Sequence, residues 1–92
     1  TKIALFGAGG KMGMRCAERL SKHSEFSLRC IEIGAAGIER LREIGLDPVT
    51  QAEAMRDADV ALLALPDRVL GPVSEAIVPL MKPGAMVLWK KG

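Results

Sequence analysis

The chain begins with an apolar segment that leads directly into a glycine-rich turn. Residues 2–6 read Lys-Ile-Ala-Leu-Phe, residues 7–13 read Gly-Ala-Gly-Gly-Lys-Met-Gly, and an amphipathic helical pattern follows as far as Leu20. Glycines let a backbone turn tightly and approach a ligand without an intervening Cβ. A helix N-terminus offers unpaired N–H groups and a positive dipole end to an anion. This order of strand, glycine turn and helix therefore predicts a dinucleotide phosphate site made of bare main-chain amides.

Two glycine spacings can be recognised in this turn. Gly7 and Gly9 supply the first two positions of G-x-G-x-x-G, but Met12 stands at the sixth position and Gly13 comes one residue late. Gly7, Gly10 and Gly13 alternatively fit G-x-x-G-x-x-G, a variant also used by pyridine-nucleotide reductases. The competing interpretation is a tight strand-to-helix turn without a ligand. Four glycines within seven residues exceed what turning needs and favour binding.

Strand and helix patterns alternate along the rest of the chain. The expected strands are residues 2–6, 26–33, 48–50, 59–65 and 85–89, and the expected helices are residues 11–22, 36–45, 50–57 and 69–81. Such alternation requires crossover connections and a parallel sheet with helices on both faces. We therefore expect an α/β fold, a Rossmann-like doubly wound parallel sheet in three αβα layers with strand order 3-2-1-4-5. Its crevice lies above the carboxyl ends of strands one and four.

Length and composition bound the function. Residues 1–92 are expected to form one dinucleotide-binding domain, with room for about half of a six-strand fold and one or two further strands. Thr1 in place of an initiator Met and the abrupt end at Lys90-Lys91-Gly92, a solvated basic tail, predict a fragment of a longer enzyme. Thirteen basic and eleven acidic residues with three aromatics give no sign of a nucleic-acid or membrane partner. Two isolated cysteines fit a cytoplasmic protein and no metal site.

Glu32 is the candidate ribose ligand. It lies near the end of the second expected strand, nineteen positions after Gly13. An acid about 20 residues beyond the turn can accept hydrogen bonds from a ribose hydroxyl, and it would repel a 2′-phosphate. Glu32 therefore favours NAD, while NADP stays possible because Lys11 and Arg15 could pair with a 2′-phosphate. The competing interpretation is a solvated carboxylate at a strand end.

Leu65-Pro66-Asp67 follows the most apolar expected strand, at the mouth of the same crevice. Proline locks φ and so fixes the path of a backbone that can pass over the cofactor. Asp67 is expected to be the N-cap of the next helix. His23 is the only histidine, and its place near a helix end indicates a surface residue. The catalytic residues are therefore unknown from this chain.

The stretches 3–13, 58–67 and 80–87 resemble the N-terminal cofactor domain of the phosphogluconate / β-hydroxyacid dehydrogenase superfamily. Within it, Gly-Ala-Gly-Gly-Lys-Met-Gly is most similar to putative phosphogluconate dehydrogenases, the group that includes the D-apionate oxidoisomerases. The resemblance implies an NAD(P)-binding domain and a separate C-terminal helical domain, which supplies much of the substrate site and the homodimer contact. The implied cofactor-binding residues are Gly7, Ala8, Gly9, Gly10, Lys11, Met12, Gly13, Glu32, Leu65, Pro66 and Asp67.

The expected function is hydride transfer between a nicotinamide cofactor and a small hydroxy acid or sugar acid, with the catalytic residues outside this chain. Two alternatives remain. One is a non-catalytic module that senses a nucleotide and reports it to a partner. The other is a reductase similar to dihydrodipicolinate reductase, which has a very similar glycine turn but a different later cofactor loop.

Overall fold

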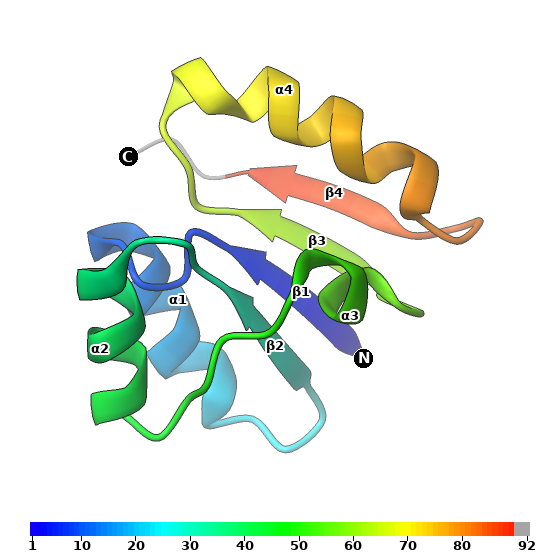
Figure 1. Cartoon of the computed structure of the whole chain (residues 1–92). Helices are drawn as coiled ribbons and strands as arrows, with labels where there is room; N and C mark the ends of the chain where they lie inside the picture. Colours follow the sequence, from blue (N-terminus) through cyan, green and yellow to red (C-terminus); the bar gives the residue numbers. More distant parts are fainter. Residues whose placement is uncertain (90–92) are drawn as a thin grey trace.

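A single parallel sheet organises the chain. The computed structural model describes residues 1–89, so the expectation for Lys90 and Lys91 lies outside the described residues. The strands are β1 (Lys2–Phe6), β2 (Ser27–Ile31), β3 (Val60–Leu63) and β4 (Met86–Trp89). They are all parallel, in the order β2-β1-β3-β4 (Figure 1). This confirms the predicted doubly wound arrangement, in which the winding reverses at β1.

The short strand expected at residues 48–50 is wrong. Pro48 forms only an isolated parallel bridge with Cys30, next to β2. The neighbouring Val49 N–H donates to the Cys30 carbonyl at 2.8 Å. Among the described residues, no other backbone hydrogen bond joins residues 48–50 to β2, so no ladder forms. Residues 48–50 therefore lie beside β2, where the predicted order places the outermost strand, but they do not form the hydrogen bonds of a strand.

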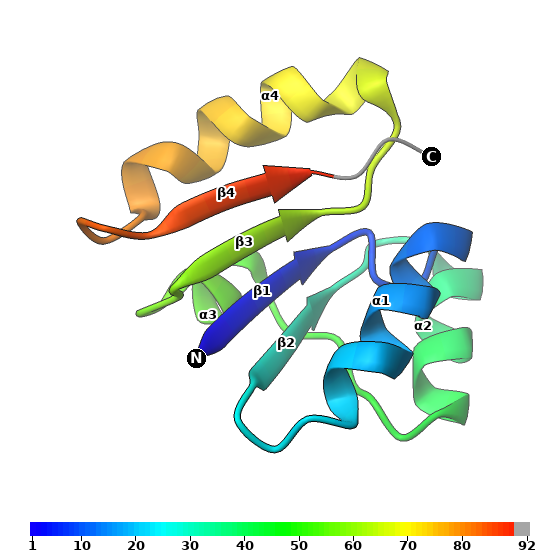
Figure 2. The ribbon, with the colours of Figure 1, turned by 180° about the vertical axis from the view of Figure 1, so that it is seen from behind.

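Helices cover both faces of the sheet, as predicted. Helices α1 (Lys11–Ser21) and α2 (Ala35–Glu43) flank the β1–β2 half, whereas α3 (Gln51–Met55) and α4 (Asp67–Ile77) pack against the other face (Figures 1 and 2). A 3-10 turn, η1 (Val78–Leu80), extends α4. In α1 the buried residues are the small Gly13 and Ala17, so this helix lies close to the sheet.

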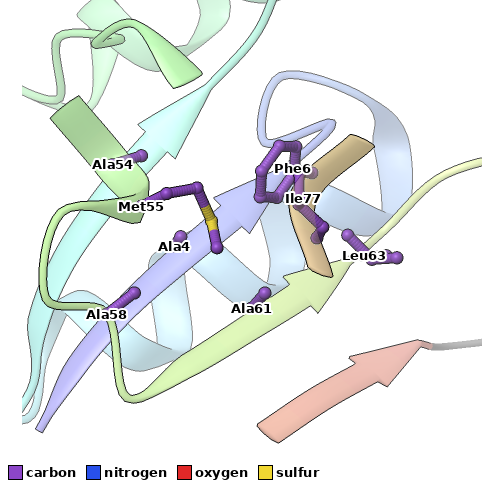
Figure 3. Close-up of a cluster of buried hydrophobic side chains, with 8 residues drawn as sticks. All are labelled: Ala4, Phe6, Ala54, Met55, Ala58, Ala61, Leu63 and Ile77. Carbon is purple, nitrogen blue, oxygen red and sulfur yellow. The ribbon is translucent and has the colours of Figure 1, made fainter. Parts of the chain in front are cut away.

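Two hydrophobic layers form the core. Below α3 and α4, Phe6, Leu63, Met55 and Ile77 pack with four alanines (Figure 3). The layer below α1 and α2 includes Leu5, Leu41 and Cys30. Burial raises the pKa of the Cys30 thiol to about 11. Cys30 is therefore a protonated core side chain at neutral pH.

A cluster of ion pairs lies at the edge of the sheet where the strands begin. The Lys2 ammonium lies 2.9 Å from the Asp57 carboxylate, and Lys82 lies 3.1 Å from Asp57 and 2.7 Å from Asp59. Hydrogen bonds from Lys2 and then Lys82 hold the pKa of Asp57 at about 2, below its ordinary 3.8. Asp57 has a φ of 60°, a left-handed conformation that Asp and Asn tolerate best among non-glycine residues.

This cluster predicts acid-sensitive stability. The folded state lowers the pKa of Asp57, so its contribution is present above the unfolded pKa and is lost as pH falls from about 4 to about 2. We expect the free energy of unfolding to fall more steeply over this window in the natural chain than in Asp57→Asn, which keeps the turn but carries no charge. Urea titrations at several pH values measure both slopes. Equal slopes would remove Asp57 from the acid response.

Within residues 1–89, no helix combines the length and apolar character needed to cross a membrane.

Candidate functional site

A cleft lies at the carboxyl edge of the sheet, where the winding reverses. It has a volume of about 470 Å³ and lies between the start of α1 and the link from β3 to α4. Its lining residues are Gly10, Lys11, Met12, Ala64, Leu65, Pro66 and Asp67. The structure thus brings together the glycine turn and the later loop that the sequence assigned to one site. Open parallel sheets bind ligands in such crevices.

Close backbone contacts explain the glycines of the turn. Gly7 has a φ of +73°, and a Cβ there would overlap the Ala64 carbonyl oxygen. A Cβ at Gly13 would overlap the carbonyl oxygen of Gly7, so α1 lies directly against the turn. Gly10 is different, because its nearest neighbour would be 3.4 Å from an added Cβ. Gly7, which both spacings share, and Gly13, which belongs to the second spacing, are therefore required by packing alone.

The first half of the turn is not made of bare amides, which corrects the simple prediction. The Gly7 and Ala8 N–H groups donate to the Ile31 carbonyl at 3.0 and 3.2 Å. The Gly9 N–H donates to Glu32 Oε1 at 2.9 Å, and the Gly10 N–H donates to the Gly7 carbonyl at 3.1 Å. These four amides hold the turn in shape and are not available to a diphosphate.

The available donors are at the first turn of α1. In the part of the chain that the structure describes, the N–H groups of Lys11, Met12 and Gly13 have no protein acceptor, and the first helical bond runs from the Met14 N–H to the Gly10 carbonyl at 2.8 Å. Lys11 and Met12 line the cleft. Unpaired amides at the positive end of a helix dipole bind anions. The N–H groups that are free for an anion are therefore fewer than the sequence predicted, and they lie at the later end of the glycine turn.

The Glu32 carboxylate accepts hydrogen bonds from main-chain N–H groups of the glycine turn and of the segment that follows β2. It lies one residue beyond β2 and is half-buried. Besides accepting from Gly9, its carboxylate accepts the N–H groups of Ile33 at 3.1 Å and Gly34 at 2.9 Å through Oε2. Carboxylate oxygens have about four lone-pair sites, so a ribose hydroxyl can still donate to them. The ribose role stays a prediction, and the structure adds a direct link from Glu32 to the glycine turn.

Gly37 and Arg40 of α2, which sequence reasoning missed, contact the glycine turn and Glu32. A Cβ at Gly9 would overlap the Gly37 backbone, and one at Gly37 would lie 2.6 Å from the Glu32 carboxyl carbon. Arg40 Nε donates to the Gly9 carbonyl at 2.8 Å. The signal that could have revealed this contact was Gly37 inside the expected helix. A glycine destabilises a helix, so its presence there suggests a close packing contact.

A second hollow opens beside the turn. It has a volume of about 190 Å³ and shares Leu65 with the cleft. Its lining is mainly apolar, and the side chain of Ile33 at its rim is 96% exposed. The other lining residues are Phe6, Gly7, Ile31, Glu32, Gln51 and Val73. Ile33 and Gln51 were not predicted, because single apolar and amide residues in loops carry no motif.

The prediction that Asp67 caps α4 is wrong. The N-cap is Pro66, with φ −61° and ψ 149°, and Asp67 is the first helical residue. A carboxylate in the first turn still interacts favourably with the helix dipole. Asp67 lines the cleft from the side opposite Lys11 and Met12.

A parallel sheet with a glycine turn opening into a helix, beside a cleft at the switch point, defines a Rossmann-type dinucleotide-binding domain. Residues 1–92 match the family described as acetohydroxy acid isomeroreductase, NADPH-binding domain. The chain belongs to this family.

Curated relatives named D-apionate oxidoisomerase match nearly the whole chain. The Cupriavidus necator protein is 44% identical over 88 residues, covering 95% of this chain and 32% of that protein. The Rhizobium rhizogenes protein is 48% identical over 89 residues, covering 96% of this chain and 32% of that protein. The chain therefore spans about a third of the length of these relatives. They confirm the expected likeness to D-apionate oxidoisomerases, and the wider likeness to phosphogluconate dehydrogenases stays a prediction.

Solved structures share the fold. A semialdehyde dehydrogenase NAD-binding protein from Cupriavidus necator, in complex with calcium and NAD, is 42% identical with a TM-score of 0.91. The match covers 95% of this chain and 32% of that chain. An NADH-preferring ketol-acid reductoisomerase from an uncultured archaeon is 26% identical with a TM-score of 0.73, over 95% of this chain and 28% of that one.

Proposed function

We propose that this chain binds NAD(H) as the cofactor domain of an oxidoreductase that transfers hydride between the nicotinamide and a small hydroxy acid or sugar acid. The observation that carries the proposal is the group of unpaired N–H donors at Lys11, Met12 and Gly13, beside a cleft at the switch point. A cofactor diphosphate is an anion of the right kind for these donors. NADP is the second cofactor to test, because the family is an NADPH-binding one.

In this proposal, the two hollows bind different parts of the cofactor. The diphosphate takes the cleft at the start of α1, and Pro66 and Asp67 face it from the β3 side. The adenine takes the smaller apolar hollow, with Ile33 and Leu65 on its rim and Glu32 beside the ribose. Apolar walls with a few polar groups are typical of cofactor sites. Within residues 1–89, this chain supplies binding and orientation and contains no acid–base pair assigned to the hydride step.

The domain works, in this proposal, as part of a longer cytoplasmic enzyme whose C-terminal domain supplies the catalytic residues and the homodimer contact. Support comes from the relatives, of which this chain spans about a third. Further support comes from β4, where Met86 is 58% and Leu88 46% exposed. These two side chains alternate with Val87 along the strand, and they lie on the face opposite α4. An exposed apolar strand face is typical of a surface that packs against another element.

Binding is tested by isothermal titration with NADH and NADPH, using two variants of one residue. Lys11→Pro removes an unpaired N–H at the first helical position, where proline is tolerated, and Gly10 already has the extended ψ of 171° that precedes proline. Lys11→Ala removes the ammonium and keeps the N–H. We expect Lys11→Pro to bind NADH about ten- to a hundredfold more weakly than Lys11→Ala, as for a lost hydrogen bond to a charged group.

Two results would contradict the proposal. One is no heat with either nucleotide at millimolar concentration. The other is equal affinity of the two variants in the presence of unchanged folding, measured by circular dichroism, since this would place the diphosphate away from the α1 amides.

A further inference from the structure

The glycine turn contains the dipeptide Gly9-Gly10, the most flexible kind of backbone link, at the point that must present the α1 amides. Gly10 is the N-cap of α1, so its orientation sets the direction of the N–H groups that follow. A turn of this kind would sample many conformations if left alone. Binding is weakened when such freedom has to be lost, and a pre-organised site avoids this cost.

Hydrogen bonds from inside and outside the turn hold this dipeptide. The peptide that joins Gly9 to Gly10 is fixed at both ends, because its carbonyl accepts from Arg40 Nε at 2.8 Å and its N–H donates to the Gly7 carbonyl at 3.1 Å. The preceding peptide, between Ala8 and Gly9, is fixed through its N–H by Glu32 Oε1 at 2.9 Å. Two side chains of opposite charge thus hold consecutive peptide planes.

Arg40 is placed for this contact by the packing of α2. Gly9 and Gly37 approach backbone to backbone, which brings the next turn of α2 within reach of the glycine turn. Arg40 is 31 residues from Gly9 in the sequence, so this bond joins two separate crossover units. In the described residues Arg40 has no carboxylate within 4.0 Å, whereas Arg42 on the same helix pairs with Asp47 at 3.5 Å. Among residues 1–89, Arg40 therefore forms a side-chain hydrogen bond only with the glycine turn.

We propose that Arg40 is a positioning residue for the cofactor diphosphate: it fixes the Gly9–Gly10 peptide so that the first amides of α1 face the cleft. The inference rests on the proposed function, because it concerns the same anion site. The proposal gives a residue of α2 a role in cofactor binding, although this helix lies outside the glycine motif. Arg40 acts through the backbone and touches no reacting atom.

The test compares ligands that differ by one phosphate. ADP and AMP are competed against NADH on the natural chain, Arg40→Met, Arg40→Lys and the control Arg42→Met, with the fraction folded measured for each. We expect Arg40→Met to reduce the ADP-over-AMP preference about tenfold and to weaken NADH and NADPH equally. Arg40→Lys, which retains a donor, should recover part of the preference, and Arg42→Met should match the natural chain.

A purely structural role would lower the folded fraction and scale all affinities together, leaving the ADP-over-AMP ratio unchanged; that result overturns the inference. Loss of NADPH affinity alone would also overturn it, because Arg40 would then contact a 2′-phosphate directly. If the natural chain binds NADH and Arg40→Met behaves identically, the inference fails and the proposed function stands. Absence of nucleotide binding by the natural chain would overturn both.

Discussion

Gly13→Ala should lower the free energy of unfolding by about 3 kcal/mol, at the upper end of the range for overpacked positions. The added Cβ would overlap the carbonyl oxygen of Gly7 and crowd the Ala8 backbone. Neither neighbour is a flexible side chain, so α1 has to move away from β1 as a unit. This also displaces the amides of Lys11 and Met12, and NADH binding should be lost together with stability. Urea denaturation and titration calorimetry measure the two effects.

Gly71→Ala is the matched control. Gly71 lies inside α4 directly before Pro72, and beyond its chain neighbours and the backbone of its own helix an added Cβ there meets nothing within 4 Å. Alanine is about 0.5–1 kcal/mol more favourable than glycine in a helix, but Pro72 disfavours a helical backbone at a preceding residue that carries a Cβ, so this variant should stay within about 1 kcal/mol of the natural chain. If Gly13→Ala is as stable as Gly71→Ala, α1 does not pack against the turn as described.

Glu32→Gln should lower the free energy of unfolding by about 1–3 kcal/mol and weaken NADH binding at least tenfold. The carboxylate accepts N–H groups on both oxygens, from Gly9 on one and from Ile33 and Gly34 on the other. Glutamine replaces one acceptor with an NH₂ group, which then faces an N–H donor. The substitution keeps the size of the side chain, so the loss reports on hydrogen bonding and charge. Chemical denaturation and NADH titration measure both quantities.

Glu43→Gln provides the comparison for this change. Glu43 is exposed at the end of α2, and among residues 1–89 it has no hydrogen bond or ion pair assigned to its carboxylate. This variant should stay within about 0.5 kcal/mol of the natural chain, as most surface substitutions do. A Glu32→Gln chain that is as stable as Glu43→Gln and binds NADH normally would remove Glu32 from the site.

The sequence predicts the strands and the place of the cleft well, because these depend on local patterns. Lys2–Phe6 is a fully apolar strand after its first residue, and both its bounds are confirmed. The β3 pattern likewise marks a buried strand, although two residues at its carboxyl end leave the ladder to line the cleft as Ala64 and Leu65. Alternation of such strands with helices, combined with right-handed crossovers, leaves few possible sheet orders.

What the sequence could not provide depends on contacts between distant segments. The pairing of Gly9 with Gly37 and the bond from Arg40 to Gly9 arise only when α2 is docked beside the turn. The isolated bridge between Pro48 and Cys30, which stands in place of the expected strand, likewise depends on how residues 48–50 lie against β2. Helical periodicity places Arg40 on an exposed helix but does not tell a solvated arginine from one bound to a carbonyl.

The last residue of β4 has a practical consequence. Trp89 is the only tryptophan in the sequence, its side chain is 61% exposed, and it pairs in register with Leu63, directly before the loop that lines the cleft. All the indole emission of residues 1–92 therefore originates at one corner, on the side where the strands end. The chain carries an intrinsic optical probe at that corner, and ligand titrations can be followed there without attaching a dye.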